Sequence, residues 1–120
     1  DDALVLNARG LVAESSATNV FALTGRILDT PPTTDGALEG LTRRTVMELG
    51  VELGLEVRER SLGRFDLYAA DAVFLTGTRA GIVPVGSLDG SPISKTGWPV
   101  VRDLSAAFDR RAVELSTPVV

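Results

Sequence analysis

The sequence predicts a single domain of the α+β class, which mixes helices with short strands. The chain has 120 residues, which is enough for one globular core but not for two. Its composition, 44% hydrophobic and 23% charged, favours an ordered chain over a disordered one. Short extended runs also alternate along the chain with segments of helical periodicity, and this alternation is typical of mixed folds.

Two β-hairpins are expected at the start of the chain. Apolar runs at 3–6 and 11–13 flank a turn-forming stretch at 7–10, so the first hairpin ends at Glu14. A second pair of apolar runs flanks a Thr-Gly turn at 24–25. The chain is therefore expected to begin with antiparallel strands.

A loop and then a helix are expected next. Two consecutive prolines predict a loop over 29–39, because they force an extended backbone. Apolar residues recur at helical spacing over Thr42–Leu53, with Thr42 as a plausible N-cap and Gly54 at the position of a C-cap glycine. Gly50 lowers helix propensity, so an earlier helix end is an alternative.

The second half of the sequence is expected to add further strands and two helices. The expected strands are 55–62, 72–75 and 82–85, and the expected helices are 66–70 and 100–112. Asp66 is expected to cap the first of these helices. The second helix carries an apolar stripe formed by Val101, Leu104 and Phe108. Asp89-Gly90 marks a turn before it.

The composition excludes several classes of function. Basic and acidic residues, 12 and 16 in number, are scattered along the chain, so no basic surface for nucleic acid is expected. The absence of cysteine and histidine excludes disulfides, most zinc sites and Ser-His or Cys-His nucleophile systems, so no metal site is expected. Chemistry must then come from carboxylates, hydroxyls, backbone amides or a cofactor.

Neither a membrane span nor a secretory leader is expected. No stretch approaches the roughly 20 apolar residues of a transmembrane helix, and no charged and apolar leader precedes Asp1. We therefore expect a cytoplasmic protein. Because the chain starts without an initiator methionine and enters a strand-like run at once, we expect it to be part of a longer polypeptide.

Three polar clusters, at 14–19, 40–43 and 76–79, lie where expected elements meet loops. The second cluster starts a helix and offers free backbone N–H groups and a hydroxyl, which suit a phosphate, although ordinary N-capping is an alternative. The third fits either a small-molecule site at a strand end or a tight turn with solvated hydroxyls. In the first cluster, Glu14 is either a surface charge or a carboxylate held for chemistry.

Taken together and in this order, the motifs resemble the second domain of the class IV aminotransferases. These are the fold type IV pyridoxal-phosphate enzymes, which include branched-chain and D-amino-acid aminotransferases and aminodeoxychorismate lyase. The segments that carry the resemblance are ESSATNVF at 14–21, TPP at 30–32, GLTR at 40–43, ADAVFLTGT at 70–78 and PV at 84–85. The resemblance implies that residues 1–120 are the larger, C-terminal, cofactor-binding domain of a homodimeric protein. Its short strands would form a barrel-like sheet with flanking helices.

The resemblance also implies a site for pyridoxal 5'-phosphate. Glu14 matches the carboxylate that pairs with the pyridine nitrogen and keeps it protonated, which makes the ring an electron sink. Leu41, Thr42 and Thr78 match the contacts to the cofactor phosphate. Asn19 matches a position beside the cofactor, although an ordinary strand-end asparagine is an alternative. The expected cofactor-binding residues are Glu14, Asn19, Leu41, Thr42, Gly77 and Thr78.

The loop that would face the substrate carboxylate contains Gly77, Thr78 and Arg79, and Thr78 and Arg79 are the expected substrate-binding residues. The sequence departs from the commonest family pattern at three positions. Arg79 stands where a small residue is usual, Ala72 where a glutamate is usual, and Trp98 where a glycine is usual. These departures leave the substrate class open between branched-chain and D-amino acids.

The resemblance places the Schiff-base lysine of the family a few tens of residues before Glu14. Lys95 is the only lysine here and lies in a late polar turn, where we expect it to be exposed. No catalytic residue is therefore expected in this chain, and an N-terminal domain or a companion chain would supply the lysine. The expected reaction is amino-group transfer from an amino acid to a 2-oxo acid. An aminodeoxychorismate lyase and a non-catalytic module with the same fold are the alternatives.

Overall fold

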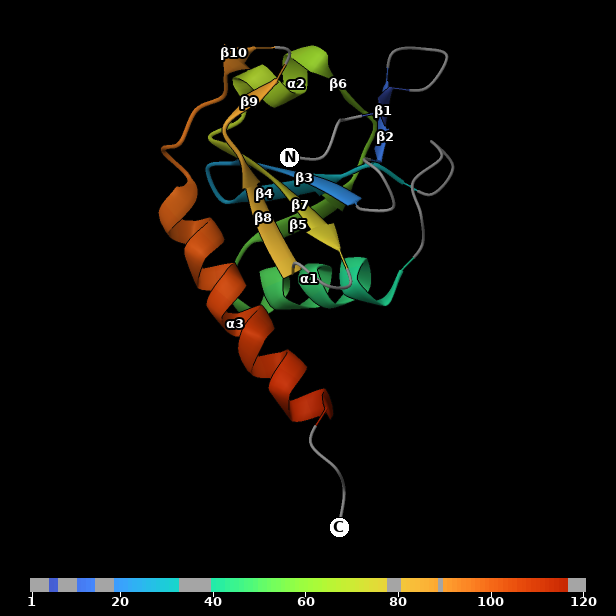
Figure 1. Cartoon of the computed structure of the whole chain (residues 1–120), viewed down its shortest axis with the longest axis vertical. Coiled ribbons are helices and arrows are strands. Elements are labelled where there is room, and N and C mark those ends of the chain that lie inside the picture. The colour runs from blue at the N-terminus through green and yellow to red at the C-terminus, as the bar shows by residue number, and fades with distance from the viewer. Residues whose placement is uncertain are drawn as a thin grey trace.

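A computed structural model describes residues 5–6, 11–14, 19–32, 40–77, 81–88 and 90–116 (Figure 1). The helices are α1 (Leu41–Glu52), α2 (Arg64–Ala69) and α3 (Trp98–Ser116). The strands are β1 (Val5–Leu6), β2 (Leu11–Glu14), β3 (Asn19–Thr24), β4 (Ile27–Thr30), β5 (Glu56–Glu59), β6 (Leu62–Gly63), β7 (Ala72–Gly77), β8 (Gly81–Val85), β9 (Ser87–Leu88) and β10 (Ser91–Pro92). The predicted mixture of helices and strands is confirmed. In these ranges, none of the helices combines the length and the apolar character needed to cross a membrane.

The central feature is a five-stranded sheet with the strand order β5-β4-β3-β7-β8. β5 runs parallel to β4, and the other neighbouring strands are antiparallel. The helices α1 and α3 pack against one face of this sheet, and α2 with β6 packs against the other (Figure 1). Two smaller sheets have the orders β1-β2-β6 and β10-β9. The sheets of the described residues are open, so the barrel-like closure implied by the resemblance is not confirmed.

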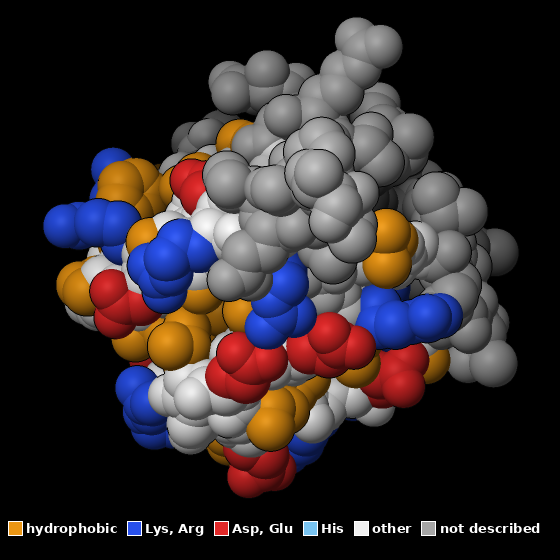
Figure 2. Space-filling model, turned by 90° about the horizontal axis from the view of Figure 1, so that it is seen from below, with side chains coloured by type: hydrophobic (Ala, Val, Ile, Leu, Met, Phe, Trp, Pro, Cys, Tyr) orange, Lys and Arg blue, Asp and Glu red, His pale blue; other side chains and the backbone are white. Residues whose placement is uncertain are grey.

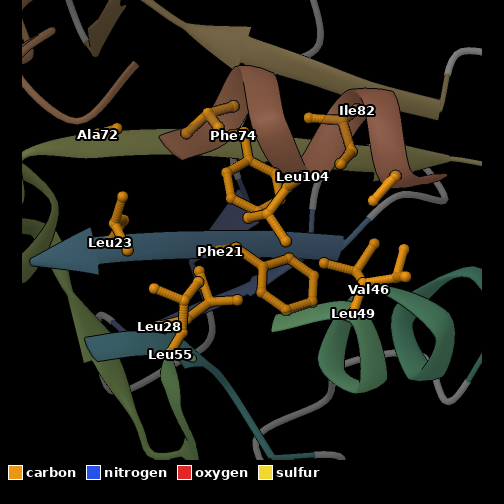
Figure 3. Close-up of a cluster of buried hydrophobic side chains, with 12 residues drawn as sticks. Phe21, Leu23, Leu28, Val46, Leu49, Leu55, Ala72, Phe74, Ile82 and Leu104 are labelled. Atoms are coloured by element: carbon orange, nitrogen blue, oxygen red, sulfur yellow. The ribbon is translucent and has the colours of Figure 1, made fainter. Parts of the chain in front are cut away.

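The strands β3 and β7 are buried on both faces, which explains why each appears in the sequence as an unbroken apolar run. Phe21 and Leu23 belong to the core under α1 and α3, whereas Val20 and Ala22 belong to the core under α2. Phe21 and its cross-strand partner Phe74 stack with ring centroids 5.1 Å apart and planes 4° apart (Figure 3). The centre of the sheet is thus a packed platform on which polar side chains at the strand ends can be held.

The two hairpins predicted at the start of the chain are confirmed. β1 pairs with β2 and β3 pairs with β4, each antiparallel. The second turn contains Gly25 with a φ of 59°, a conformation that glycine adopts without strain. Glu14 ends β2, as the sequence predicts.

α1 is present, but its capping differs from the prediction. Its N-cap is Gly40, with extended backbone (φ −125°, ψ 160°), so the prediction of Thr42 as the N-cap is wrong. The helix continues through Gly50. A Cβ at this position would lie 2.8 Å from the Val57 side chain, so glycine allows the close packing of α1 against β5. Gly54 follows the helix with a φ of 84°, in the role the sequence predicts.

The other two helices also differ from the sequence at their ends. Asp66 is the third residue of α2 rather than its N-cap, and its carboxylate accepts a hydrogen bond from the N–H of Gly63 at 2.7 Å. α3 extends beyond 100–112 in both directions. The predicted apolar stripe of α3 is confirmed, since Val101 and Leu104 are buried and Phe108 packs against the same core.

Two predictions about strands are wrong. The segment 55–62 does not form one strand, because β5 belongs to the large sheet and β6 pairs with β2 in another. The loop expected over 29–39 begins later, because β4 continues to Thr30, whose hydroxyl donates to the carbonyl oxygen of Val20 at 2.8 Å. The predicted turn residue Asp89 and the part of that loop at 33–39 lie outside the described residues.

Charged side chains of both signs are interspersed on the face seen from below in Figure 2. Arg111 of α3 lies 2.7 Å from Glu52 and 3.6 Å from Glu48, both on α1. These exposed pairs join the two helices, and each contributes about 0.2–1 kcal/mol at most. This face carries no continuous basic surface among the described residues.

A buried carboxylate joins β4 to β5 on the α2 side of the sheet. The Asp29 side chain is 3% exposed and accepts hydrogen bonds from Arg58 and Arg60, each at 2.9 Å. Burial, the largest single influence, raises the pKa of Asp29, but the hydrogen bonds and charges of Arg58 and Arg60 together outweigh it and hold the pKa below its ordinary value of 3.8. The ionised carboxylate therefore stabilises the fold at neutral pH.

Asp29→Asn is expected to lower the free energy of unfolding at pH 7 by about 2 kcal/mol, because the three hydrogen bonds from Arg58 and Arg60 lose their anionic acceptor. The folded-state pKa is lowered, so the stabilisation is present above the ordinary pKa and is lost as the pH falls below it. Denaturant unfolding of the complete protein between pH 6 and pH 3 should therefore show a smaller acid-dependent loss in the variant. Glu56→Gln, which changes an exposed carboxylate 4.0 Å from Arg58, is the control. Equal effects of both variants would contradict the role of Asp29.

Candidate functional site

The first turn of α1 presents backbone N–H groups that the helix itself does not use. The first intrahelical bond runs from the N–H of Arg44 to the carbonyl oxygen of Gly40 at 3.1 Å. The N–H groups of Leu41 and Thr42 therefore have no partner within the helix. The turn contains no acidic residue. Free N–H groups at the positive end of a helix attract an anion such as a phosphate.

Thr42 lies on the side of α1 that faces the sheet. It precedes the buried Val46 by four residues, and residues four apart share a helix face. Thr42 is half-buried, whereas its neighbour Leu41 is 72% exposed. The hydroxyl of Thr42 and the N–H of Leu41 are thus the groups of this turn that could contact a ligand held between α1 and the sheet.

The first turn of α1 lies at one particular end of the large sheet. The other end of the helix lies beside the turn between β3 and β4, where Arg26 donates to the carbonyl oxygen of Leu53 at 2.8 Å. A 12-residue helix is about 18 Å long, which matches the length of the six-residue strand β3. The first turn therefore lies where β3 begins and β4 ends. Arg43 confirms this placement, since it donates to the carbonyl oxygen of Pro31 at 3.1 Å.

Two buried polar side chains lie at the same end of the sheet. In the β3–β7 register, Phe21 pairs with Phe74 on the face covered by α1. Two residues further along each strand, and therefore on the same face, Asn19 pairs with Thr76. Asn19 is 5% exposed and Thr76 is 0% exposed. Neither Asn19 Oδ1 nor Thr76 Oγ1 has a hydrogen-bond partner in the part of the chain that the structure describes. A buried polar group without a partner costs about 1–3 kcal/mol, so this arrangement indicates a ligand or a bound water.

We call this region the site end: the start of β3 with Asn19, the end of β7 with Thr76 and Gly77, and the first turn of α1. Gly77 is the last residue of β7, as the sequence predicts. Glu14 ends β2, which packs against β3, and four residues separate it from Asn19. The Glu14 side chain, Thr78 and Arg79 lie outside the described part of the structure. The structure therefore brings Asn19, Leu41, Thr42 and Gly77 to one end of the sheet.

Arg43 is a site-end residue to which sequence reasoning assigned no role. Its side chain is 3% exposed and pairs with Glu59 of β5, in addition to the bond to Pro31. These contacts fix the first turn of α1 to the end of β4 and to β5. An arginine inside the GLTR motif was the available signal, but only the structure shows that its side chain turns inward.

The family departures at Ala72 and Trp98 lie away from the site end. A Cβ on Gly97, the residue before Trp98, would lie 3.0 Å from the side chain of Leu23 and 3.1 Å from that of Ala72. This contact is at the opposite end of the sheet, beside the β3–β4 turn. Lys95, two residues earlier, is exposed as predicted, and its Nζ lies 5.2 Å from the centroid of the Trp98 ring. These residues are therefore not placed to contact a ligand at the site end.

A separate cavity of about 160 Å³ lies between β8 and α3. It is lined by Ile82, Pro84, Trp98, Val101, Arg102 and Ser105. The described site residues Asn19, Leu41 and Thr42 are not among its lining. No cluster of three or more acidic residues suited to a metal ion occurs within the described ranges. A ligand at the site end would thus be held by hydroxyls, an amide and backbone N–H groups.

Comparison with known proteins supports the resemblance to the class IV aminotransferases over most of the chain. Residues 1–88 match the family model for amino-transferase class IV. The branched-chain-amino-acid aminotransferase of Escherichia coli (strain K12) is 41% identical over 108 residues, which cover 89% of this chain and 35% of that protein. The chain thus spans about a third of the length of the curated relatives it matches.

Solved structures agree in fold over nearly the whole chain. The branched-chain aminotransferase from Thermobaculum terrenum, solved in its PLP form, is 42% identical with a TM-score of 0.86, covering 92% of this chain and 37% of that one. A putative 4-amino-4-deoxychorismate lyase from Legionella pneumophila is 35% identical with a TM-score of 0.84, covering 92% and 41%. The same fold therefore occurs in proteins named for two different reactions.

Proposed function

Because this chain belongs to the class IV aminotransferase family, we propose that it forms the cofactor-binding part of a pyridoxal-phosphate aminotransferase. The reaction is the transfer of an amino group between an amino acid and a 2-oxo acid. The observation that carries the proposal is the meeting, at one end of the sheet, of the Leu41 and Thr42 N–H groups with buried Asn19 Oδ1 and Thr76 Oγ1, which have no partner among the described residues. An anionic ligand with hydrogen-bonding groups fits this combination.

The residues of the site end fit pyridoxal 5'-phosphate. The N–H of Leu41 and the hydroxyl of Thr42 hold the phosphate at the positive end of α1, and Thr78 contributes a second hydroxyl from the loop after β7. Glu14 pairs with the pyridine nitrogen, and Asn19 lies beside the ring. Bound in this way, the cofactor supplies a protonated ring that withdraws electrons from the substrate α-carbon.

Branched-chain amino acids are the proposed substrates, because the curated relatives with 36–45% identity are named as branched-chain enzymes. A D-amino acid remains the alternative that the family resemblance raised. Thr78 and Arg79 are proposed to face the substrate carboxylate, since a guanidinium matches a carboxylate in a bidentate way. The lyase reaction is the second candidate function, favoured by the similar Legionella pneumophila structure. An assay of the complete protein for pyruvate release from aminodeoxychorismate separates the two.

The chain needs a partner segment in this proposal. It covers about a third of its relatives, so the lysine that binds the cofactor covalently is assigned to an N-terminal portion or a companion chain. A homodimer in the cytoplasm is proposed for the complete protein. A non-catalytic module would need neither the hydroxyl of Thr42 nor the carboxylate of Glu14, and this distinguishes it from the enzyme.

The proposed phosphate contacts are tested by removing single hydroxyls from the complete protein. Thr42→Val and Thr78→Val are each expected to weaken pyridoxal-phosphate binding about 10- to 150-fold, because each removes a charge-assisted hydrogen bond of about 1.5–3 kcal/mol. Binding of pyridoxal, which has no phosphate, should not change. Fluorescence titration of the apoprotein with both ligands measures the two affinities.

Thr45→Val is the matched control, since Thr45 is a buried threonine one turn further along α1. It should leave the ratio of the two affinities unchanged. An equal loss of pyridoxal and pyridoxal-phosphate binding in Thr42→Val would contradict the assignment of the phosphate to α1.

A further inference from the structure

Asn19 and Thr76 form a pair with a defined geometry. They are register partners on adjacent antiparallel strands and lie on the face covered by α1. Directly opposed side chains on one face have Cβ atoms about 4.5–5.5 Å apart. The two side chains nevertheless do not hydrogen-bond to each other, and both atoms lack a partner among the described residues. The register thus places two buried, unsatisfied polar atoms on neighbouring strands, where one small bridging group can satisfy both.

The chemistry of the two atoms restricts what that group can be. Asn19 Oδ1 only accepts hydrogen bonds, whereas the Thr76 hydroxyl both donates and accepts. The bridging group must therefore carry a hydrogen for Asn19. A phosphate dianion has none to offer, so it cannot satisfy Asn19 directly. A water molecule can donate to Asn19 Oδ1 and accept from the Thr76 hydroxyl at the same time, and buried waters typically make about three hydrogen bonds.

We propose that Asn19 and Thr76 hold one ordered water at the floor of the cofactor site, and that this water donates its second hydrogen to the cofactor phosphate. This inference rests on the proposed function, which places the phosphate at the first turn of α1, on the same face and at the same end of the sheet. The hydrogen bonds then run from Thr76 to the water and from the water to both Asn19 and the phosphate. Thr76 and Asn19 are positioning residues, since they act on the cofactor through the water.

Removing the Thr76 hydroxyl should affect the apoprotein and the cofactor complex differently. In the complete protein, Thr76→Val is expected to weaken pyridoxal-phosphate binding about 3- to 10-fold, the effect of one neutral hydrogen bond, and to leave pyridoxal binding unchanged. The apoprotein should lose at most the stability of one neutral hydrogen bond, because the hydroxyl contacts the water and has no protein partner among the described residues. Thr76→Ser, which keeps the hydroxyl, should bind the cofactor like the wild type.

Asn19→Leu tests the same water from the other strand and serves if Thr76→Val fails to fold. It should give a similar loss of pyridoxal-phosphate affinity. The double variant should lose little more than either single variant, because both remove one shared water. A high-resolution crystal structure of the complete protein with bound cofactor should show a water within about 3 Å of Thr76 Oγ1 and Asn19 Oδ1.

Several results would overturn the inference. These are unchanged phosphate-dependent affinity in Thr76→Val, an equal loss of pyridoxal binding, fully additive single losses, or a marked drop in apoprotein melting temperature that Thr76→Ser rescues. The last result would make the hydroxyl a structural group of the fold. If Thr42→Val also leaves pyridoxal-phosphate binding unchanged, the proposed function itself fails. If Thr42→Val behaves as expected and Thr76→Val does not, only the water is wrong.

Discussion

Glu14→Gln in the complete protein is expected to lower the rate constant of amino transfer by at least about 100-fold, while the affinity for pyridoxal phosphate changes only a few-fold. An ionised carboxylate beside the pyridine nitrogen keeps a proton on that atom, because opposite charges stabilise each other. Glutamine preserves the size of the side chain but removes the charge. The ring then loses its protonated form, and with it most of its capacity to stabilise charge at the substrate α-carbon.

Single-turnover kinetics and equilibrium titration of the same Glu14→Gln preparation separate the two effects. Glu14→Asp, which keeps the charge on a shorter side chain, is the matched variant and should retain more activity than glutamine does. The end of β2 places Glu14 five positions before Asn19, so both variants keep the backbone that leads to the site end. Equal losses of rate and affinity, or a loss of neither, would contradict the assignment of Glu14 to the pyridine nitrogen.

Borohydride reduction of the complete protein with pyridoxal phosphate is expected to attach the cofactor to a lysine outside these 120 residues and to leave Lys95 unmodified. Lys95 is exposed, and Gly97, two residues later, packs beside Leu23 and Ala72. The Leu23–Ala72 pair lies four residues along β3 and β7 from the Asn19–Thr76 pair, so about 13 Å separates the two pairs. A Schiff base needs an amine held against the cofactor aldehyde, and Lys95 is at the wrong end of the sheet.

Peptide mass spectrometry after reduction identifies the modified lysine. Lys95→Met should retain the activity and the visible absorbance of the covalent complex. A pyridoxyl group on Lys95, together with loss of activity in Lys95→Met, would show that the active site is organised differently from the one proposed.

Much of the fold could be predicted from local sequence patterns. The hairpin that ends at Glu14 follows from its turn residues and apolar runs, and the stripe of α3 follows from helical periodicity. The predictions failed where contacts between residues far apart in the sequence determine the structure. β5 and β6 form a continuous segment in sequence, but they pair with β4 and β2 in different sheets. The N-cap of α1 is Gly40 and not the predicted Thr42, because the extended backbone of Gly40, rather than a side-chain hydroxyl, starts the helix.

The candidate site was predictable only in part. Polar clusters at the junctions of helices or strands with loops indicated Asn19, Thr42 and Gly77, and the structure brings these residues to one end of the sheet. The pairing of Asn19 with Thr76 depends on strand register, which a single sequence does not reveal. The inward turn of Arg43 depends on Glu59, which is 16 residues away along the chain. Long-range contacts of this kind have no local signature.

We propose that the first turn of α1 and the ends of β2, β3 and β7 form one half of a pyridoxal-phosphate site. A crystal structure of the complete protein with bound cofactor tests it most directly. We expect the phosphate within hydrogen-bonding distance, about 3 Å, of the Leu41 N–H and the Thr42 hydroxyl, and the pyridine nitrogen at the same distance from the Glu14 carboxylate. A cofactor bound elsewhere, such as in the cavity between β8 and α3, with the first turn of α1 open to solvent, would contradict it.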